Sequence, residues 1–124
     1  MTFTIQWKDK GVFITFRGIV KSQDLIDANN YLLSNADFDS LDYQVIDFSD
    51  VEDFKATSYD MGILGSMNSS QSLFNKKIKV AFITSDDYIK EQIKEYNKYM
   101  INTDWEIHTF NNLKEAKNRF KFDE

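Results

Sequence analysis

The sequence of 124 residues predicts an α/β fold, a five-stranded mixed, mostly parallel sheet with helices mainly on one face. Two observations lead to this prediction. After an initial pair of strand-like segments, helix-like and strand-like segments alternate in the order β-β-α-β-α-β-α-β-α, and strands joined through helices run parallel by right-handed crossovers. The strand-like segments are also apolar on one side and mixed on the other, whereas a doubly covered sheet reads as continuous apolar runs.

The chain starts with a predicted β-hairpin. Residues 2–8 alternate strictly between apolar and polar side chains, and residues 12–19 resume a strand-like pattern. Asp9, Lys10 and Gly11 between them are residue types of a tight turn. We therefore place the first strand antiparallel to the second.

The first two helices are predicted from their caps. Ser22 is a plausible N-cap for a helix with the apolar stripe Leu25, Ala28 and Leu32, which frays near residues 34–40. The second helix is expected to begin at Thr57, three residues before Asp60 in a capping-box arrangement. Three further strands are predicted at Tyr43–Phe48, Ile78–Thr84 and Trp105–Phe110. A third helix is predicted to begin at 85–87, with the apolar stripe Ile89, Ile93, Tyr96 and Met100. A last helix is predicted to be capped by Asn112 and Glu115, with Leu113, Ala116 and Phe120 facing inward.

Side-chain alternation divides the strands between two faces. Val45 is assigned to the uniformly apolar face. Phe13, Ile46 and Ile83 form a small apolar centre on the second, otherwise half-polar face. Self-association through these three residues would give a homodimer, and this alternative stays open.

Composition limits the function classes. The net charge of −5 argues against nucleic-acid binding, which needs a basic surface, and the absence of cysteine excludes disulfides and thiolate metal sites. No segment approaches the length of about 18 apolar residues that a membrane span needs, and the N-terminus does not resemble a signal peptide. We expect one domain over residues 1–124 in the cytoplasm, without stable membrane insertion.

The acidic stretch VIDFSDVEDF at 45–54 has two interpretations. Its carboxylates are suitable ligands for a cation at the end of a strand, or Asp47 ends the strand and the following acids lie in a solvated loop. We adopt the second interpretation and predict no metal site. His108 is the only histidine and is interpreted as an ordinary side chain of the half-polar face, so no catalytic residue or cofactor is predicted.

Thr57 and Ser58 also have two interpretations. A hydroxyl at a helix start caps the free backbone N–H groups, and the same position places a phosphate beside them. We interpret Thr57 as a cap and keep phosphorylation as the alternative.

The order of the elements, with FRGIVKSQDL, VIDFSDVEDF, VAFITSD and HTFNNLKEAKNRF in their places, resembles the STAS/SpoIIAA-like superfamily. It is most similar to the small stand-alone branch called SpoIIAA-like or STAS/SEC14-like, over nearly the whole chain. The resemblance implies a sheet with helices mainly on one side. In anti-sigma-antagonist members an Asp-Ser-Ser-Gly turn starts helix two and one of its serines is phosphorylated to switch partner binding. The matching positions here are Ala56, Thr57, Ser58 and Tyr59, so the Asp and the Gly are replaced.

Two glycines in the second helix suggest a close approach to its backbone, by the neighbouring sheet or by a ligand or partner. Gly62 and Gly65 have the spacing G-x-x-G, and glycine costs stability in a helix interior. A hydrophobic groove between helices two and three is therefore a candidate ligand site. The groove candidates are Met61, Gly62, Gly65, Met67, Phe74, Tyr88 and Tyr99.

These observations lead to two functional hypotheses. The first is a non-enzymatic regulatory module that binds a protein partner through Thr57, Ser58 and Tyr59 and the adjoining surface. The second, which the SEC14-like branch implies, is a carrier of a small hydrophobic or lipid-like ligand in the groove.

Overall fold

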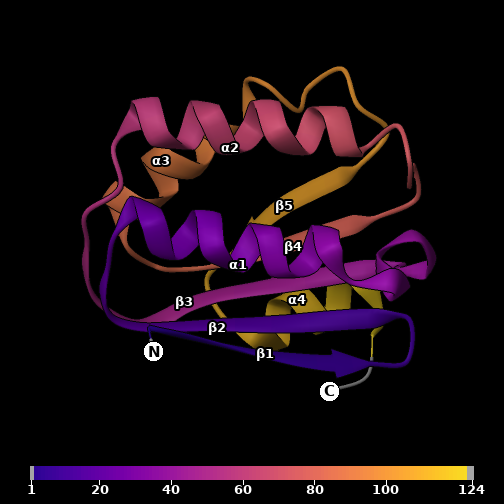
Figure 1. The fold of residues 1–124 in the computed structure, drawn as a ribbon. Helices are drawn as coiled ribbons and strands as arrows, with labels where there is room; N and C mark the ends of the chain where they lie inside the picture. The colour runs from indigo at the N-terminus through magenta and orange to yellow at the C-terminus, as the bar shows by residue number, and fades with distance from the viewer. Residues whose placement is uncertain (1, 123–124) are drawn as a thin grey trace.

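The computed structural model describes residues 2–122, so Met1, Asp123 and Glu124 of the predicted domain lie outside the described residues. The described chain forms one sheet in the order β1-β2-β3-β4-β5, in which β1 is antiparallel to β2 and every other neighbouring pair is parallel (Figure 1). This confirms the predicted fold class. The strands are β1 (Phe3–Lys8), β2 (Gly11–Val20), β3 (Tyr43–Phe54), β4 (Lys79–Ile83) and β5 (Glu106–Phe110).

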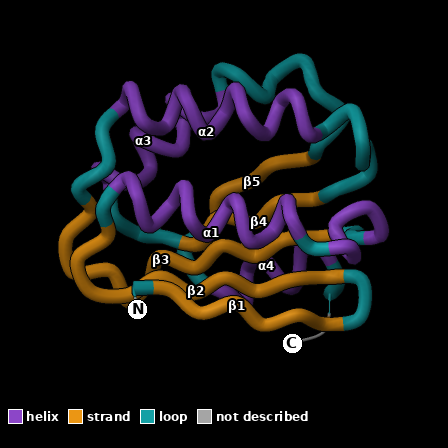
Figure 2. The backbone as a smooth tube through the Cα atoms, in the orientation of Figure 1, coloured by secondary structure: helices purple, strands orange, loops and turns teal. Residues whose placement is uncertain are grey.

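Three long helices cover one face of the sheet and a short one covers the other. Figures 1 and 2 show α1, α2 and α3 on one side of the tilted sheet and α4 on the other. The crossovers between parallel strands place α2 and α3 on the same face. The last helix follows the last strand, so no crossover determines its side. The helices are α1 (Ser22–Ser34), the 3-10 helix η1 (Ala36–Ser40), α2 (Ser58–Gln71), α3 (Asp87–Asn97) and α4 (Leu113–Phe120).

The main core lies between the sheet and the upper three helices. Phe16, Phe48 and Phe82 stack across the centre of the sheet, with ring centroids 5.2 Å apart for the first pair and 6.3 Å for the second. Ile93 and Tyr96 of the predicted α3 stripe close the core from above. Aromatic side chains thus supply much of the buried apolar area in a short chain.

A second core lies between the sheet and α4, and it corrects the predicted faces of β3. Val45 packs in this second core, whereas Ile46 packs against the main core. The register explains the error, because Val45 pairs with Phe13 and Ile46 with Ile14, which reverses the predicted phase of β3. Ile83 is fully buried under α4. The patch predicted from Phe13, Ile46 and Ile83 therefore does not exist as an exposed surface.

Several strand ends shift by one residue, and two changes of boundary affect the elements around the start of α2. Lys21, not Ser22, is the N-cap of α1, and Ser22 is its first helical residue. The third strand continues past Phe48 to Phe54 because it pairs with the long β2, with register shifts at 15–17 and 18–19. The acidic stretch is therefore strand rather than the predicted loop.

Candidate functional site

The start of α2 is fixed by a reciprocal cap. Thr57 is the N-cap, and its hydroxyl accepts a hydrogen bond from the Asp60 N–H at 3.3 Å. The Asp60 carboxylate accepts from the Thr57 N–H at 3.0 Å and from the Thr57 hydroxyl at 2.8 Å. This is the predicted capping box, and it occupies the Thr57 hydroxyl as both donor and acceptor.

The same carboxylate also joins α2 to α1. The Ser22 hydroxyl, on the first residue of α1, donates a hydrogen bond to the Asp60 carboxylate. This bond, followed by the bonds from the Thr57 N–H and hydroxyl, holds the pKa of Asp60 below its usual value. Ser22 therefore links two helix starts rather than capping its own helix.

Ser58 and Tyr59 lie on the exposed side of this capped helix start. The Ser58 hydroxyl donates to Gln92 of α3 over 3.2 Å, and the Tyr59 side chain is 77% exposed. Ile63 lies one turn further along α2 and is also exposed. The structure thus places Thr57, Ser58 and Tyr59 together, with different surroundings for the two hydroxyls.

The two glycines of α2 face α3 and the turn after it. A Cβ atom at Gly65 would lie 2.7 Å from the backbone oxygen of Tyr96 and 2.9 Å from the Tyr99 Cβ. At Gly62 the nearest atom is in the Tyr99 ring, at 3.1 Å. The close approach that the glycines suggested is therefore made by the end of α3, and neither by the sheet nor by an open groove.

The other groove candidates are dispersed. Met61 is buried in the main core, Met67 is half-buried, and Phe74 is 72% exposed in the turn after α2. The Tyr88 hydroxyl donates to the Ala56 carbonyl at 3.0 Å, and the Tyr88 ring contacts the edge of Phe54. These side chains do not converge on one cavity.

The structure contains a cleft between α1, α2 and the sheet, which the sequence did not predict. Its free volume is about 50 Å³, and Met61 is the one groove candidate that lines it. Asn29 and Asn68 also line it from the two helices. A polar amide at Asn29, between Ala28 and Leu32 of the predicted apolar stripe, was the signal in the sequence that could have indicated it.

The acidic stretch shows no arrangement for a cation. Asp50, Glu52 and Asp53 are exposed, Asp53 pairs with Lys55 at 3.1 Å, and Asp47 accepts from the Ser49 N–H at 2.8 Å. Among residues 2–122, no three histidine or acidic side chains converge as metal ligands would.

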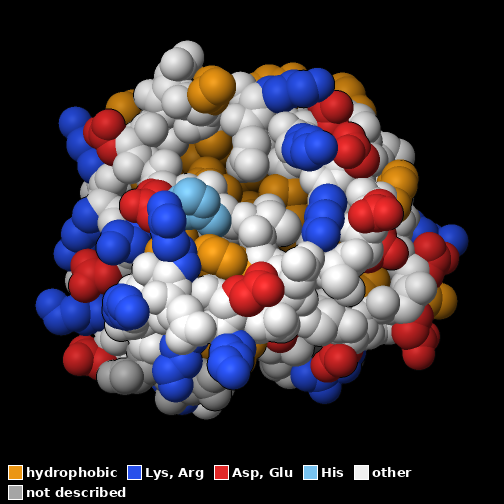
Figure 3. All heavy atoms as spheres, turned by 180° about the vertical axis from the view of Figure 1, so that it is seen from behind, with side chains coloured by type: hydrophobic (Ala, Val, Ile, Leu, Met, Phe, Trp, Pro, Cys, Tyr) orange, Lys and Arg blue, Asp and Glu red, His pale blue; other side chains and the backbone are white. Residues whose placement is uncertain are grey.

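His108 lies on β5, over the second core. Figure 3 shows its ring among acidic and basic side chains on the rear face of the molecule. Its Nε2 lies 3.3 Å from the Glu106 carboxylate and 3.4 Å from the Arg119 guanidinium, and its ring packs against Phe120. These are the contacts of a surface side chain satisfied by its neighbours.

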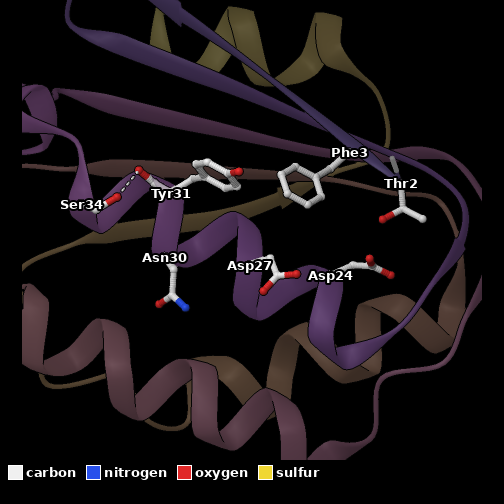
Figure 4. A pocket seen from close by; sticks show the side chains of 7 residues that line it. All are labelled: Thr2, Phe3, Asp24, Asp27, Asn30, Tyr31 and Ser34. Atoms are coloured by element: carbon white, nitrogen blue, oxygen red, sulfur yellow. Dashed lines mark hydrogen bonds between the residues drawn. The ribbon is translucent and has the colours of Figure 1, made fainter.

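An open groove of about 580 Å³ runs between the start of β1 and the outer side of α1. Figure 4 shows the rings of Phe3 and Tyr31 together, with Asp24 and Asp27 along the helix. Asp24 is engaged as an acceptor for the Lys21 N–H, and Asp27 accepts from Gln23 at 2.8 Å. Both carboxylates therefore have local structural roles.

Comparisons with solved structures identify the fold. The chain matches the anti-sigma factor antagonist SpoIIAA in its unphosphorylated form with a TM-score of 0.60 and 11% identity, over 98% of this chain and 99% of that one. It matches the Bacillus cell fate determinant SpoIIAA in the phosphorylated form with a TM-score of 0.58 and 12% identity, over 94% and 97%. An anti-sigma factor antagonist from Mycobacterium paratuberculosis gives a TM-score of 0.60 and 17% identity, over 98% and 94%.

The chain therefore has the STAS/SpoIIAA-like fold, as its sequence motifs suggested. No protein-family model matches the sequence. No curated protein matches it either. None of the helices in the described part of the chain has the length and apolar character needed to cross a bilayer.

Proposed function

We propose that the protein is a non-enzymatic regulatory module of the cytoplasm that binds a protein partner through the start of α2. One observation carries this proposal: an exposed tyrosine stands on a rigidly capped helix start, in the fold of structures described as anti-sigma factor antagonists. The partner we propose is an anti-sigma-factor-like protein.

The contact surface consists of Tyr59, Ile63 and Tyr99, and we call it the α2 surface. Their side chains are 77%, 37% and 51% exposed, and Tyr99 packs against the glycines of α2. A tyrosine ring buries a large area at small entropic cost, and aromatic residues are enriched at interfaces. The capping box fixes the helix backbone that carries Tyr59, which lowers the cost of ordering this segment on binding.

Ser58 is the residue through which we propose that this contact is switched. Thr57 is less suitable, because a phosphate there destroys the cap and lies beside the Asp60 carboxylate. Ser58 is the exposed first residue of α2, where free N–H groups and the helix dipole favour a phosphate. A charge of about −2 next to Tyr59 opposes an apolar contact. One of the similar structures is described as a phosphorylated form.

Binding measurements test the proposal. Isothermal titration against anti-sigma-factor-like proteins of the same organism should detect a complex, which Tyr59→Ala should weaken at least tenfold, as loss of about 1.4 kcal/mol requires. Tyr31→Ala is the matched control, because Tyr31 is 58% exposed on α1, away from the α2 surface. Ser58→Glu should weaken the complex and Ser58→Ala should preserve it. Equal losses from Tyr59→Ala and Tyr31→Ala would contradict the proposal.

A further inference from the structure

The cleft between α1, α2 and the sheet is the apolar cavity of the helical layer. Figure 1 shows α1 and α2 running side by side on the same side of the sheet. Residues of both helices and of the strands line the cleft. Ile14 and Ile46 form its floor, and Leu25, Met61 and Leu64 form its walls. No charged side chain lines it.

Three amide side chains, those of Asn29, Gln44 and Asn68, line this otherwise apolar space, and two of them, Asn29 and Asn68, lack complete hydrogen bonding. Asn29 of α1 and Asn68 of α2 are each only 8% exposed. Asn68 donates to the Tyr96 hydroxyl at 2.6 Å, but its Oδ1 has no hydrogen-bond partner, and neither does the Asn29 Nδ2. An unpartnered buried polar group costs about 1–3 kcal/mol, so a leucine at position 29, where the amide makes no bond through its Nδ2, would be cheaper for folding alone.

The two free atoms are complementary to a hydroxyl group. Asn29 Nδ2 needs an acceptor and Asn68 Oδ1 needs a donor, and a hydroxyl is the smallest organic group that supplies both. A charged ligand is disfavoured, because the cleft offers no opposite charge to offset desolvation. We propose that the cleft binds a small uncharged alcohol, with its hydroxyl between Asn29 and Asn68 and its apolar body against Leu25, Met61 and Leu64. This site is independent of the partner surface proposed above.

The volume sets the size of the ligand. An apolar cavity of about 150 Å³ is known to hold benzene, and a single water needs about 10–15 Å³. The space of about 50 Å³ therefore admits a hydroxyl and a few carbons, with any longer chain lying in the mouth between α1 and α2. Water is the expected occupant when no alcohol is bound, because a polar site of this size can hold one. An alcohol that reproduces the hydrogen bonds of this water and also buries apolar surface displaces it favourably.

Titration of the ¹⁵N-labelled protein with 1-butanol tests the proposal, because the side-chain amides of Asn29 and Asn68 are observed directly by NMR. Both amide signals should shift in a saturable manner. Sodium butyrate and butylammonium chloride at the same concentration should leave them in place. 1-Chlorobutane, which has a similar body but no hydroxyl, should bind about tenfold more weakly, as expected for the loss of a hydrogen bond.

Two variants on adjacent residues of α1 provide the matched comparison. Asn29→Leu removes the donor and fills the space, so butanol binding should weaken at least tenfold, while Asn30→Leu, on the exposed side, should preserve it. The series of probes on the unmodified protein decides the question even if Asn29→Leu fails to fold. Absence of saturable shifts at Asn29 and Asn68, equal binding of butanol and chlorobutane, or equal binding by both variants would overturn the proposal and leave water as the only occupant.

Discussion

Asp60 is the residue on which the start of α2 and its connection to α1 both depend. One carboxylate oxygen accepts from the hydroxyls of Ser22 and Thr57 and from the Thr57 N–H. These bonds favour the charged form, so the folded pKa lies below the ordinary value of 3.8. Asp60 therefore stabilises the fold at pH values above about 3.8, and this contribution is lost as the pH falls through the lower folded pKa.

Asp60→Asn should lower the free energy of unfolding at pH 7 and make it fall less steeply between about pH 5 and 2 than in the unmodified protein. Urea unfolding at a series of pH values measures both effects. Asp39→Asn is the control, because Asp39 is an exposed aspartate in η1. Parallel pH profiles for Asp60→Asn and the unmodified protein would exclude the proposed role of the carboxylate.

Tyr96 holds a second polar contact inside the main core. Its hydroxyl accepts from the Asn68 amide at 2.6 Å, and burial raises its pKa above the ordinary value of a tyrosine. Tyr96→Phe should destabilise the protein by about 1–3 kcal/mol, because it leaves the buried Asn68 amide without an acceptor. Tyr99 has a half-exposed ring in the turn after α3, so Tyr99→Phe should change stability by less than about 0.5 kcal/mol. Chemical denaturation compares the two variants. An unchanged free energy of unfolding in Tyr96→Phe would show that the hydrogen bond is dispensable.

At the scale of elements, the contact between α2 and α3 depends on one glycine more than on the other. Gly65 lies against the Tyr96 backbone, which is held in α3, whereas Gly62 lies against the half-exposed ring of Tyr99. Alanine at either position gains about 1 kcal/mol of helix propensity. Only at Gly65 must two helices separate to accommodate it.

Gly65→Ala should therefore destabilise the protein by about 1–2 kcal/mol, since overpacking exceeds the gain in propensity. Gly62→Ala should be close to neutral, because the Tyr99 ring can shift outward. Urea midpoints of the two variants measure the difference. Equal effects of both substitutions would mean that close helix packing is not the reason for the glycines.

The elements also show what local sequence signals determine. The caps at Thr57 and Asn112 were predicted correctly because a side chain and the backbone N–H three residues later suffice to form them. The end of the third strand was predicted too early, because Phe54 is held in the sheet by its pairing with Val20, which is distant in the sequence. The cleft beside Asn29 was missed for the same reason, since two helices distant in sequence must pack before it exists.

At the scale of the whole molecule, the two faces of the sheet are covered unequally. The sequence predicted this asymmetry from the half-polar second face, but it assigned Val45 and Ile46 to the wrong sides. Val45 and Ile46 are adjacent and both apolar, so alternation alone cannot say which of them faces which side of the sheet. Only the register, in which Val45 pairs with Phe13 and Ile46 with Ile14, decides it. The second face is consequently more apolar than predicted, and α4 covers it.

The covering of the second face by α4 leads to the last prediction. Phe120 of α4 packs edge-on against Phe110 with ring centroids 5.6 Å apart, in the cluster that contains Val45 and Ile83. Phe120→Ala should cost about 3 kcal/mol of stability, within the range for buried phenylalanines. It should also promote concentration-dependent self-association, because loosening α4 exposes an apolar sheet face.

Urea unfolding and sedimentation velocity over a range of concentrations measure the two effects. Phe74→Ala is the matched control: Phe74 is 72% exposed, so its removal should change neither stability by more than about 0.5 kcal/mol nor the sedimentation coefficient. A destabilised but strictly monomeric Phe120→Ala would mean that the remaining contacts of the second core, through Ala116 and Phe122, keep the sheet covered. Unchanged stability would show instead that the sheet does not depend on α4, because the main core then supports the fold without a cover on the second face.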